Sequence, residues 1–213
     1  MTTAAELIKN VSDSQDEILV NLLELYVPTK RFDWDPTFGH GGFYRSGIVP
    51  LPGLPSDLVR NRLKGTEIHS HHRDCRAPFP SHLNAPASII FDPPFLHACG
   101  KKSVMGKQFG SYNSQDALRQ MYADSLSNFF NVLQPGGVLV FKCCDVIESS
   151  KKILTHCYVW SMACFRGFEV LDLFVLTTNK CIVGWNHHKQ QHARNMCSYF
   201  MVFRKPYEKG TRA

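Results

Sequence analysis

The stretch that decides the fold is Ala87-Ser88-Ile89-Ile90-Phe91-Asp92-Pro93-Pro94-Phe95. Residues 87–91 form an apolar run of strand length, and Asp92 is the first residue after it. Two successive prolines end the strand, because proline lacks a backbone N–H and its ring fixes φ. The prolines also hold the backbone rigid. The Asp92 carboxylate and the Pro93 carbonyl are therefore expected to be hydrogen-bond acceptors beside the ring of Phe95.

Strands and helices alternate on both sides of this stretch. Downstream, residues 114–133 have helical spacing, and Gln134-Pro135-Gly136-Gly137 is a turn into the continuous apolar strand Val138-Leu139-Val140-Phe141. Continuous runs of this kind are typical of parallel strands covered on both faces. The remaining elements are expected as strands over residues 31–37, 63–68, 169–177 and 199–203, a helix over residues 149–165, and loops over residues 46–55, 69–86 and 96–112. The alternation predicts an α/β fold: a single Rossmann-like domain with a mostly parallel sheet of seven strands, or six, flanked by helices.

The length of 213 residues fits one domain with a core of its own. Residues 1–30 are expected to be a helical segment that packs on the core, residues 31–206 the α/β domain, and residues 207–213 a tail. The hydrophobic content of 44% and charged content of 20% are typical of soluble globular proteins. No apolar run approaches bilayer length, and residues 1–10 lack a secretory signal pattern, so an intracellular protein, cytoplasmic or nuclear, without a membrane partner is expected.

The net charge and the pattern of cysteines and histidines indicate which kinds of binding partner and metal site to expect. A formal net charge of +6 and a pI near 8.9 favour a polyanionic partner. The eight cysteines form no C-x-x-C pair and no zinc-finger spacing, so they are expected to be reduced. Histidines cluster near residues 69–72 and 187–192 without the usual carboxylate or thiolate partners, so no metal is predicted.

A glycine-rich turn follows the first expected strand of the domain: Asp35-Pro36-Thr37-Phe38-Gly39-His40-Gly41-Gly42-Phe43. Glycines permit a tight turn and close approach of the backbone to a ligand. In open α/β sheets, ligands bind beyond the carboxyl ends of the strands. Glu67, at the end of the second expected strand, lies about where an acidic residue would accept hydrogen bonds from a ribose, ~20 residues beyond a nucleotide-binding turn. Taken singly, the turn also fits an ordinary loop and Glu67 a solvated carboxylate.

The Asp-Pro-Pro-Phe tetrapeptide after an apolar strand resembles the signature of the amino-methyltransferases that modify adenine, cytosine or guanine amino groups. Residues 35–41 resemble the S-adenosylmethionine-binding turn of those enzymes, and residues 134–140 resemble the lead into the fifth strand of class I methyltransferases. The similarity spans residues 32–204. It implies S-adenosyl-L-methionine as the cofactor, bound by Asp35, Thr37, Gly39, Gly41, Gly42, Glu67 and Asp92. Because little chain separates Gly42 from Asp92, the third strand is expected to be short or absent, with Asp74 as the candidate contact to the adenine ring.

The resemblance implies catalysis by Asp92, Pro93, Pro94 and Phe95. The Asp92 carboxylate and the Pro93 carbonyl would accept the N–H groups of an exocyclic amine, with adenine N6 favoured. Phe95 would stack on the base, an interaction worth ~1–3 kcal/mol in single-strand binders. A base in a duplex would first have to be flipped out.

Basic loops indicate a nucleic-acid substrate. The residues expected to contact phosphates are Lys101, Lys102, Lys107, His192 and Arg194. RNA is favoured over DNA, because the chain has no space for a separate target-recognition region, and dependence on a partner protein subunit stays open. Two alternatives are a protein side-chain N-methyltransferase and a non-catalytic, cofactor-binding subunit of a methyltransferase complex. The basic loops argue against the first, and the intact motifs against the second.

Overall fold

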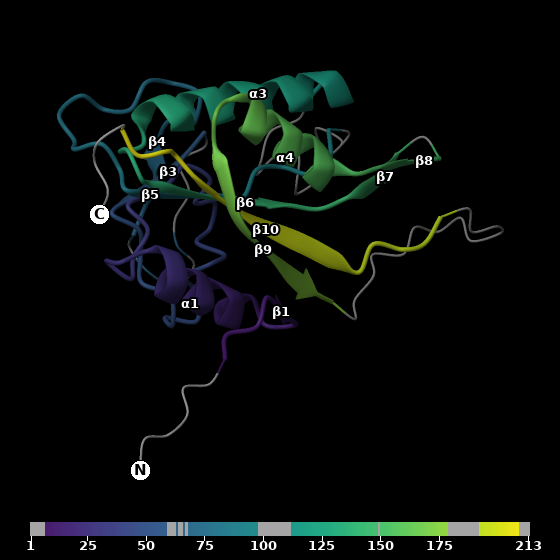
Figure 1. Ribbon diagram of the computed structural model, residues 1–213, viewed down its shortest axis with the longest axis horizontal. Helices are drawn as coiled ribbons and strands as arrows, with labels where there is room; N and C mark the ends of the chain where they lie inside the picture. Colours follow the sequence, from purple (N-terminus) through teal and green to yellow (C-terminus); the bar gives the residue numbers. More distant parts are fainter. Residues whose placement is uncertain are drawn as a thin grey trace, which may run out of the picture.

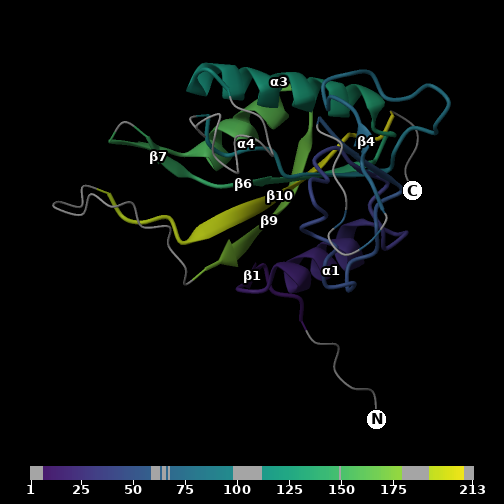
Figure 2. The same cartoon turned by 180° about the vertical axis from the view of Figure 1, so that it is seen from behind.

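The computed structural model describes residues 7–58, 63, 66, 68–97, 112–148, 150–178 and 192–208. It has three layers, with helix α1 (Gln15–Tyr26) on one face of a mixed sheet. Helices α3 (Gln115–Val132) and α4 (Thr155–Phe165) cover the other face, as the two opposite views show (Figures 1 and 2). The α/β class predicted from the alternating pattern is confirmed.

The main sheet has eight strands in the order β1-β9-β10-β6-β5-β2-β3-β4. Their bounds are Val11–Ser12 (β1), Trp34–Asp35 (β2), Leu54–Asp57 (β3), His71–His72 (β4), Ser88–Phe91 (β5), Val138–Cys143 (β6), Glu169–Thr177 (β9) and Cys197–Arg204 (β10). A separate antiparallel hairpin consists of β7 (Val146–Glu148) and β8 (Lys151–Ile153). From β4 to β6 the strands follow the spatial order 3-2-1-4-5 of Rossmann-like sheets.

The sheet departs from the expected seven or six strands in two ways. The two residues of β1 add an eighth strand, which pairs in parallel with β9. Strand β10 runs antiparallel to both of its neighbours, β9 and β6, whereas every other neighbouring pair described is parallel. Because β10 turns back along β9 without a crossover helix, its first residues lie at the edge where the parallel strands end.

Local sequence explains where the two longest helices begin. The Ser14 side chain accepts a hydrogen bond from the Glu17 N–H at the start of α1, and Ser114 does the same for Ala117 in α3. Both are N-cap hydrogen bonds that satisfy otherwise unpaired helix donors. One stripe of α1 is apolar and fully or nearly fully buried: Ile18, Leu19, Leu22 and Leu23. These four residues belong to the core on that face of the sheet.

The central strands are buried on both faces, as their continuous apolar sequence predicted. On β5 and β6, Ile90 and Val140 belong to the core under α1, whereas the alternate residues Phe91 and Phe141 belong to the core under α3 and α4. All six residues of β6 are buried. Alternation with a period of two distributes the side chains to the two cores. The parallel pairing of β5 with β6 brings Phe91 opposite Phe141.

Two sequence-based expectations are wrong. The second strand lies at Leu54–Asp57, although its sequence, Leu-Pro-Ser-Asp, is typical of a loop, and the described residues of the range 63–68 (Leu63, Thr66 and Ile68) are not in a strand. Tertiary contacts override that preference, because the buried Trp34 indole donates a 2.8 Å hydrogen bond to the Ser56 hydroxyl. Within residues 149–165, α4 begins only at Thr155, because the β7–β8 hairpin occupies the preceding residues.

Strand β4, two residues long, is the short third strand that the spacing predicted.

Candidate active site

Two segments meet where the strand order reverses, between β2 and β5. Asp35 is the last residue of β2, and Asp92 follows the last residue of β5, the strand beside it. This switch point is where open α/β sheets bind ligands. The structure therefore brings together the glycine turn and the Asp-Pro-Pro-Phe tetrapeptide, which are far apart in sequence.

The Asp35 carboxyl lies beneath the turn and holds its shape. It is fully buried and accepts hydrogen bonds from the Thr37 N–H at 2.9 Å and from the Tyr44 hydroxyl at 2.8 Å. Burial raises the pKa of Asp35 to about 7, and these two hydrogen bonds act in the opposite direction. Asp35 therefore supports the turn from inside the protein, and Tyr44 shields it from solvent.

Thr37 links the turn to the tetrapeptide. Its Oγ1 accepts a 2.7 Å hydrogen bond from the Asp92 N–H and lies 3.3 Å from Asp35 Oδ1. Further along the turn, Gly39 and Gly41 have φ values of 53° and 69°, in the left-handed region that favours glycine. A Cβ on Gly41 would also lie 2.1 Å from Leu63 Cδ1. Both glycines are needed for this backbone path.

Strand β3 supplies the acidic residue at its carboxyl end. Asp57 Oδ2 accepts a 2.7 Å hydrogen bond from the Gly39 N–H. This is the position, beside the turn and 18 residues from Gly39, that the sequence argument gave to Glu67. Glu67 itself lies outside the described residues, and the second strand ends at Asp57 instead. Asp57 was missed because Pro52 and Pro55 made its surroundings resemble a loop.

A hollow with about 470 Å³ of empty space, including its open mouth, lies between the ends of β3 and β5 and helix α3. Its walls combine acidic groups with apolar and aromatic side chains: Pro36, Thr37, Asp57, Leu58, Asp74, Cys75, Arg76, Phe91, Asp92, Pro93, Pro94, Tyr112 and Met121. Asp74, the expected adenine contact, lines this hollow. A hydrogen bond from the Arg76 side chain lowers the pKa of Asp74 below its ordinary value, despite partial burial. A flat, polar-edged group fits such a lining.

A second hollow lies on the other side of Thr37 and Asp92, which line both. Its lining carries basic side chains and the glycine turn: Gln15, Thr37, Phe38, Gly39, His40, Gly42, Phe43, Arg45, Asp92 and Lys142. The turn backbone and the cations suit a negatively charged group. The two hollows together could hold one elongated ligand that passes Thr37 and Asp92.

Helix α3, the core and strand β6 each contact the tetrapeptide. The Tyr122 hydroxyl of α3 donates to the Pro94 carbonyl at 2.5 Å, while the Phe95 ring packs partly buried against the core. Asp92 Oδ2 forms an ion pair with Lys142 Nζ at 3.0 Å. Burial raises the pKa of Asp92 above its ordinary value, and the charge of Lys142 acts in the opposite direction.

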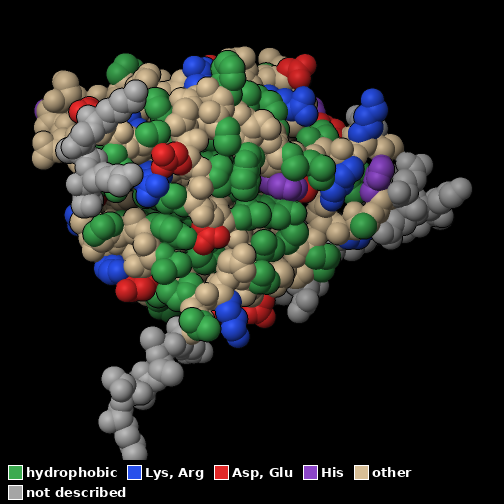
Figure 3. Space-filling model, viewed as in Figure 1, with side chains coloured by type: hydrophobic (Ala, Val, Ile, Leu, Met, Phe, Trp, Pro, Cys, Tyr) green, Lys and Arg blue, Asp and Glu red, His purple; other side chains and the backbone are tan. Residues whose placement is uncertain are grey.

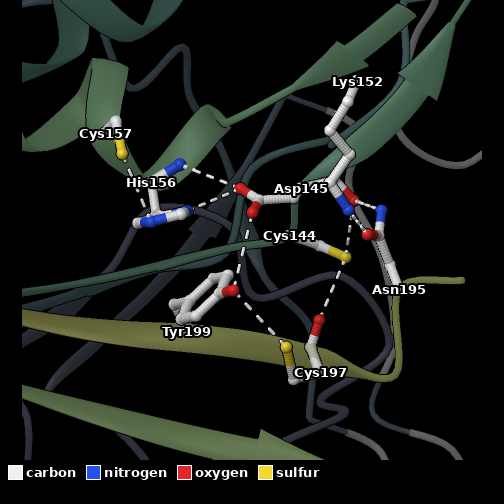
Figure 4. A network of polar contacts seen from close by, with 8 residues as sticks. All are labelled: Cys144, Asp145, Lys152, His156, Cys157, Asn195, Cys197 and Tyr199. Atoms are coloured by element: carbon white, nitrogen blue, oxygen red, sulfur yellow. Dashed lines mark hydrogen bonds and ion pairs between the residues drawn. The ribbon is translucent and has the colours of Figure 1, made fainter. Parts of the chain in front are cut away.

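A polar network next to this site joins the end of β6, the start of α4 and the start of β10 (Figure 4). At its centre, the buried Asp145 carboxyl accepts from His156 Nδ1 at 2.7 Å, and Tyr199 Oη lies 3.5 Å away. The Asn195 side chain donates to the Asp145 carbonyl and accepts from Lys152. The network fixes residues 195–199 at the edge of the sheet where the parallel strands end.

The structure describes two of the five residues expected to contact phosphates, His192 and Arg194. Arg194 is exposed beside this network, and His192 Nε2 lies 2.8 Å from the Ser150 carbonyl oxygen. Figure 3 shows Lys or Arg and His side chains together on the side where Figure 1 places β7 and β8. Lys101, Lys102 and Lys107 lie outside the described residues. Sequence reasoning missed Lys142 and Asp145, although a lone Lys inside an apolar strand was a visible signal.

Some classes of site are not found in the described part of the chain. It contains no group of three or more His, Cys, Asp or Glu side chains placed to hold a metal ion. The six cysteines that it includes are free. Among the helices described, none is both long and apolar enough to cross a bilayer.

No protein-family model matches the chain, and no curated protein matches it. Similar solved structures include TTHA0409 of Thermus thermophilus, a candidate DNA modification methylase complexed with S-adenosyl-L-methionine (19% identity, TM-score 0.45, covering 66% of this chain and 55% of that one). Another is TrmN from Thermus thermophilus (17% identity, TM-score 0.49, covering 89% of this chain and 48% of that one). A third is the N-methyltransferase NodS from Bradyrhizobium japonicum WM9 (13% identity, TM-score 0.49, covering 90% of this chain and 96% of that one). This chain spans about half the length of the two Thermus proteins.

Proposed function

We propose that this protein is an S-adenosyl-L-methionine-dependent class I methyltransferase that methylates the exocyclic amine of a nucleic-acid base. Adenine N6 is the preferred target. The observation that carries the proposal is the Thr37–Asp92 hydrogen bond. It joins the glycine turn and the Asp-Pro-Pro-Phe tetrapeptide into one site at the switch point. Each segment taken singly is a common pattern, whereas their contact at the ligand-binding edge of the sheet is specific.

The residues present fit S-adenosyl-L-methionine. The Asp57 carboxylate at the end of β3 suits the ribose hydroxyls. Asp74, together with the apolar Leu58 and Met121, suits an adenine ring in the first hollow. In the second hollow, Arg45 and the turn backbone suit a carboxylate. When bound, the cofactor supplies an electrophilic methyl group, which leaves its sulfur as the nitrogen lone pair of the substrate forms the new bond.

Asp92 and Pro93 orient the substrate amine. The Asp92 carboxylate and the Pro93 carbonyl, which receives no hydrogen bond from the described residues, are acceptors for its two N–H groups. These hydrogen bonds turn the nitrogen lone pair toward the methyl group, and the proton released on transfer moves toward Asp92. Phe95 provides a ring for stacking against the base. Alignment supplies most of the rate enhancement.

RNA is favoured over DNA as the substrate polymer. The described part of the chain contains one main sheet and one hairpin without a second unit for target recognition. Arg194 is exposed shortly before β10, whose first residues lie at the edge where the parallel strands end. A partner protein could supply further contacts. The second candidate function is N-methylation of a protein side chain, since the same acceptors would orient an amide or amine nitrogen.

The test is transfer of labelled methyl from S-adenosyl-L-methionine to total RNA, genomic DNA and a protein lysate in parallel, followed by nucleoside and amino-acid analysis. Label in methyladenine of either polymer supports the proposal and identifies the substrate. Label in protein alone overturns it in favour of the second candidate. An Asp92→Ala variant is expected to bind cofactor in calorimetry yet transfer no methyl, and near-native turnover would refute the role of Asp92.

Cofactor binding by the wild type without label in any pool points to a missing partner subunit. The assay is then repeated with a cell extract as the source of that partner. No transfer under these conditions overturns the catalytic proposal and leaves the non-catalytic subunit. No cofactor binding at all overturns the assignment of both hollows.

A further inference from the structure

A lysine is buried in the middle of the sheet. Lys142 is the only charged residue of β6, and it is 9% exposed in a strand whose other residues are all buried. Burying an ammonium group costs free energy unless the charge is paired. A lysine at such a position, lining a hollow of the site, requires a specific partner for its charge.

The contacts of Lys142 hold its ammonium group in one place. Nζ lies 3.0 Å from Asp92 Oδ2 and donates to Gln15 Oε1 at 3.1 Å. The same nitrogen lies 5.0 Å from the ring centroid of Phe43 and 5.4 Å from that of Phe200. Both distances are within the range of cation–π attraction. One carboxylate, one amide oxygen and two ring faces therefore fix the charge beside Asp92.

Two further acidic groups near Asp92 come from neighbouring strands. They are Asp35 at the end of β2 and Asp57 at the end of β3. Burial first, and then repulsion from Asp92 and Asp57, raises the pKa of Asp35. The hydroxyls of Tyr44 and Tyr122 are neutral and already donate, to Asp35 and to the Pro94 carbonyl respectively.

Two cationic side chains besides Lys142 line the hollows. Arg45 lines the second hollow, and Arg76, which pairs with Asp74, lines the first. Among the described residues, Lys142 is the cation in contact with Asp92. The ionisation of Asp92 therefore depends on one ammonium group more than on any other charge described.

We propose that Lys142 is a positioning and specificity-determining residue: it keeps Asp92 ionised within a neutral ion pair, so that the site accepts an uncharged amine and rejects an alkylammonium. This inference rests on the proposed function and names the charge class of its substrate. An ionised carboxylate accepts N–H hydrogen bonds, whereas a protonated one would donate to the amine. A lysine substrate would place a second cation beside Lys142, and such like-charge contacts suppress the wrong partner.

The direct test measures Asp92 itself. The wild type, Lys142→Gln and Lys142→Arg are labelled with ¹³C at the aspartate carboxyls, and the carboxyl resonances are titrated without substrate. An Asp92→Asn variant identifies the Asp92 resonance. Removing the charge is expected to move the Asp92 titration to higher pH, because burial then acts unopposed, whereas Lys142→Arg leaves it close to the wild-type value. An unchanged titration in folded Lys142→Gln overturns the proposal.

The matched control is Lys205→Gln. Lys205 also lies near a ring, 5.4 Å from the Phe130 centroid, and donates to the Leu133 carbonyl, but at the opposite end of β6. This variant should leave the Asp92 titration unchanged. A shift as large as in Lys142→Gln would show a general effect of removing charge and would refute a specific role for Lys142.

Transfer assays test the specificity. In Lys142→Gln, the acid limb of the kcat/KM profile on an adenine-containing oligonucleotide should move to higher pH. The ratio of transfer to that oligonucleotide over transfer to a lysine-containing peptide should fall by about ten-fold or more. An unchanged ratio overturns the specificity. If Lys142→Gln fails to fold, Lys142→Arg serves instead: a lower kcat with an unchanged Asp92 titration supports positioning, and an unchanged kcat overturns it.

The two proposals fail in different ways. If the wild type transfers no methyl to RNA or DNA even with the cell extract added, the proposed function falls, and the carboxyl titration still decides whether Lys142 sets the ionisation of Asp92. If the wild type methylates nucleic acid but Lys142→Gln keeps the wild-type titration and substrate ratio, only the role of Lys142 falls.

Discussion

The hydroxyl oxygen of Thr37 accepts a 2.7 Å hydrogen bond from the backbone N–H of Asp92. Residues on two neighbouring strand ends are thereby held in register by one side chain. A change in the position of the glycine turn would therefore act on Asp92 through this bond. Thr37 also lines both hollows, so it lies where the proposed cofactor would pass from one to the other.

Thr37→Val keeps the shape of the side chain and removes this hydrogen bond. We expect kcat/KM for methyl transfer to fall about ten-fold, because an intramolecular hydrogen bond contributes ~0.5–1.5 kcal/mol and the part-buried Asp92 N–H loses its acceptor. Steady-state kinetics measure the change. The control is Thr29→Val, since the Thr29 hydroxyl donates only to the exposed Arg31 carbonyl. Equal rates in the two variants would contradict the proposed link.

Asp57→Asn tests the ribose contact. We expect cofactor affinity to fall about ten- to one-hundred-fold, since hydrogen bonds to a charged group contribute ~1.5–3 kcal/mol. Isothermal titration calorimetry with S-adenosylhomocysteine measures the dissociation constant. Asp116→Asn is the matched control, because the Asp116 side chain is 92% exposed on the first turn of α3. An unchanged dissociation constant in Asp57→Asn would remove Asp57 from the cofactor site.

The buried Asp35 carboxyl predicts a pH dependence of stability. Its pKa is raised to about 7 in the folded protein against an ordinary value of 3.8, so between these values the folded state binds more protons than the unfolded state. The free energy of unfolding should therefore fall as pH rises from about 4 to about 7, by up to ~4 kcal/mol from this group. Urea unfolding at pH 5 and pH 8 measures the change.

Asp35→Asn isolates that effect, because the amide does not titrate: its oxygen can accept from the Thr37 N–H, and its NH2 group can donate to the Tyr44 hydroxyl oxygen. The variant should lose less stability between pH 5 and pH 8 than the wild type. If both proteins lose the same amount, Asp35 is not the group responsible.

Arg194→Ala tests the contact with the polyanion. Loss of one phosphate contact should weaken nucleic-acid binding and reduce the slope of log K against log salt concentration by about one. Cofactor affinity should not change, because Arg194 does not line either hollow. The control is Arg204→Ala at the far end of β10, where the guanidinium pairs with Glu169. A salt slope equal to that of the wild type would rule out a phosphate contact at Arg194.

The sequence was informative where local pattern and tertiary environment agree. The continuous apolar runs of β5 and β6 predicted strands buried on both faces, and the tetrapeptide that follows β5 was placed correctly at the switch point. Leu54–Asp57 could not be recognised, because what makes this segment a strand is contact with Trp34 and the turn, not its own propensity. The residue at the end of the second strand was consequently assigned to Glu67 and not to Asp57.

The buried polar residues were missed for a different reason. A strand pattern says that Lys142 is surrounded by apolar residues, but it does not say which carboxylate lies opposite it. Asp145 is similar, since its partners His156, Asn195 and Tyr199 come from two later segments. Pairing across elements depends on sheet order, and the insertion of β10 between β9 and β6 was not predictable from periodicity.

The position of β10 between β9 and β6 also determines when the sheet can be completed during synthesis. Strand β10 is the last strand described along the chain, yet it occupies the interior of the sheet and pairs with β6 and β9 at once. Until residues 197–204 have left the ribosome, two long apolar strands have no neighbour between them. The emerging chain therefore carries unpaired edges on β6 and β9 until this strand is added, and Phe200, whose ring lies against Lys142 Nζ, arrives with it.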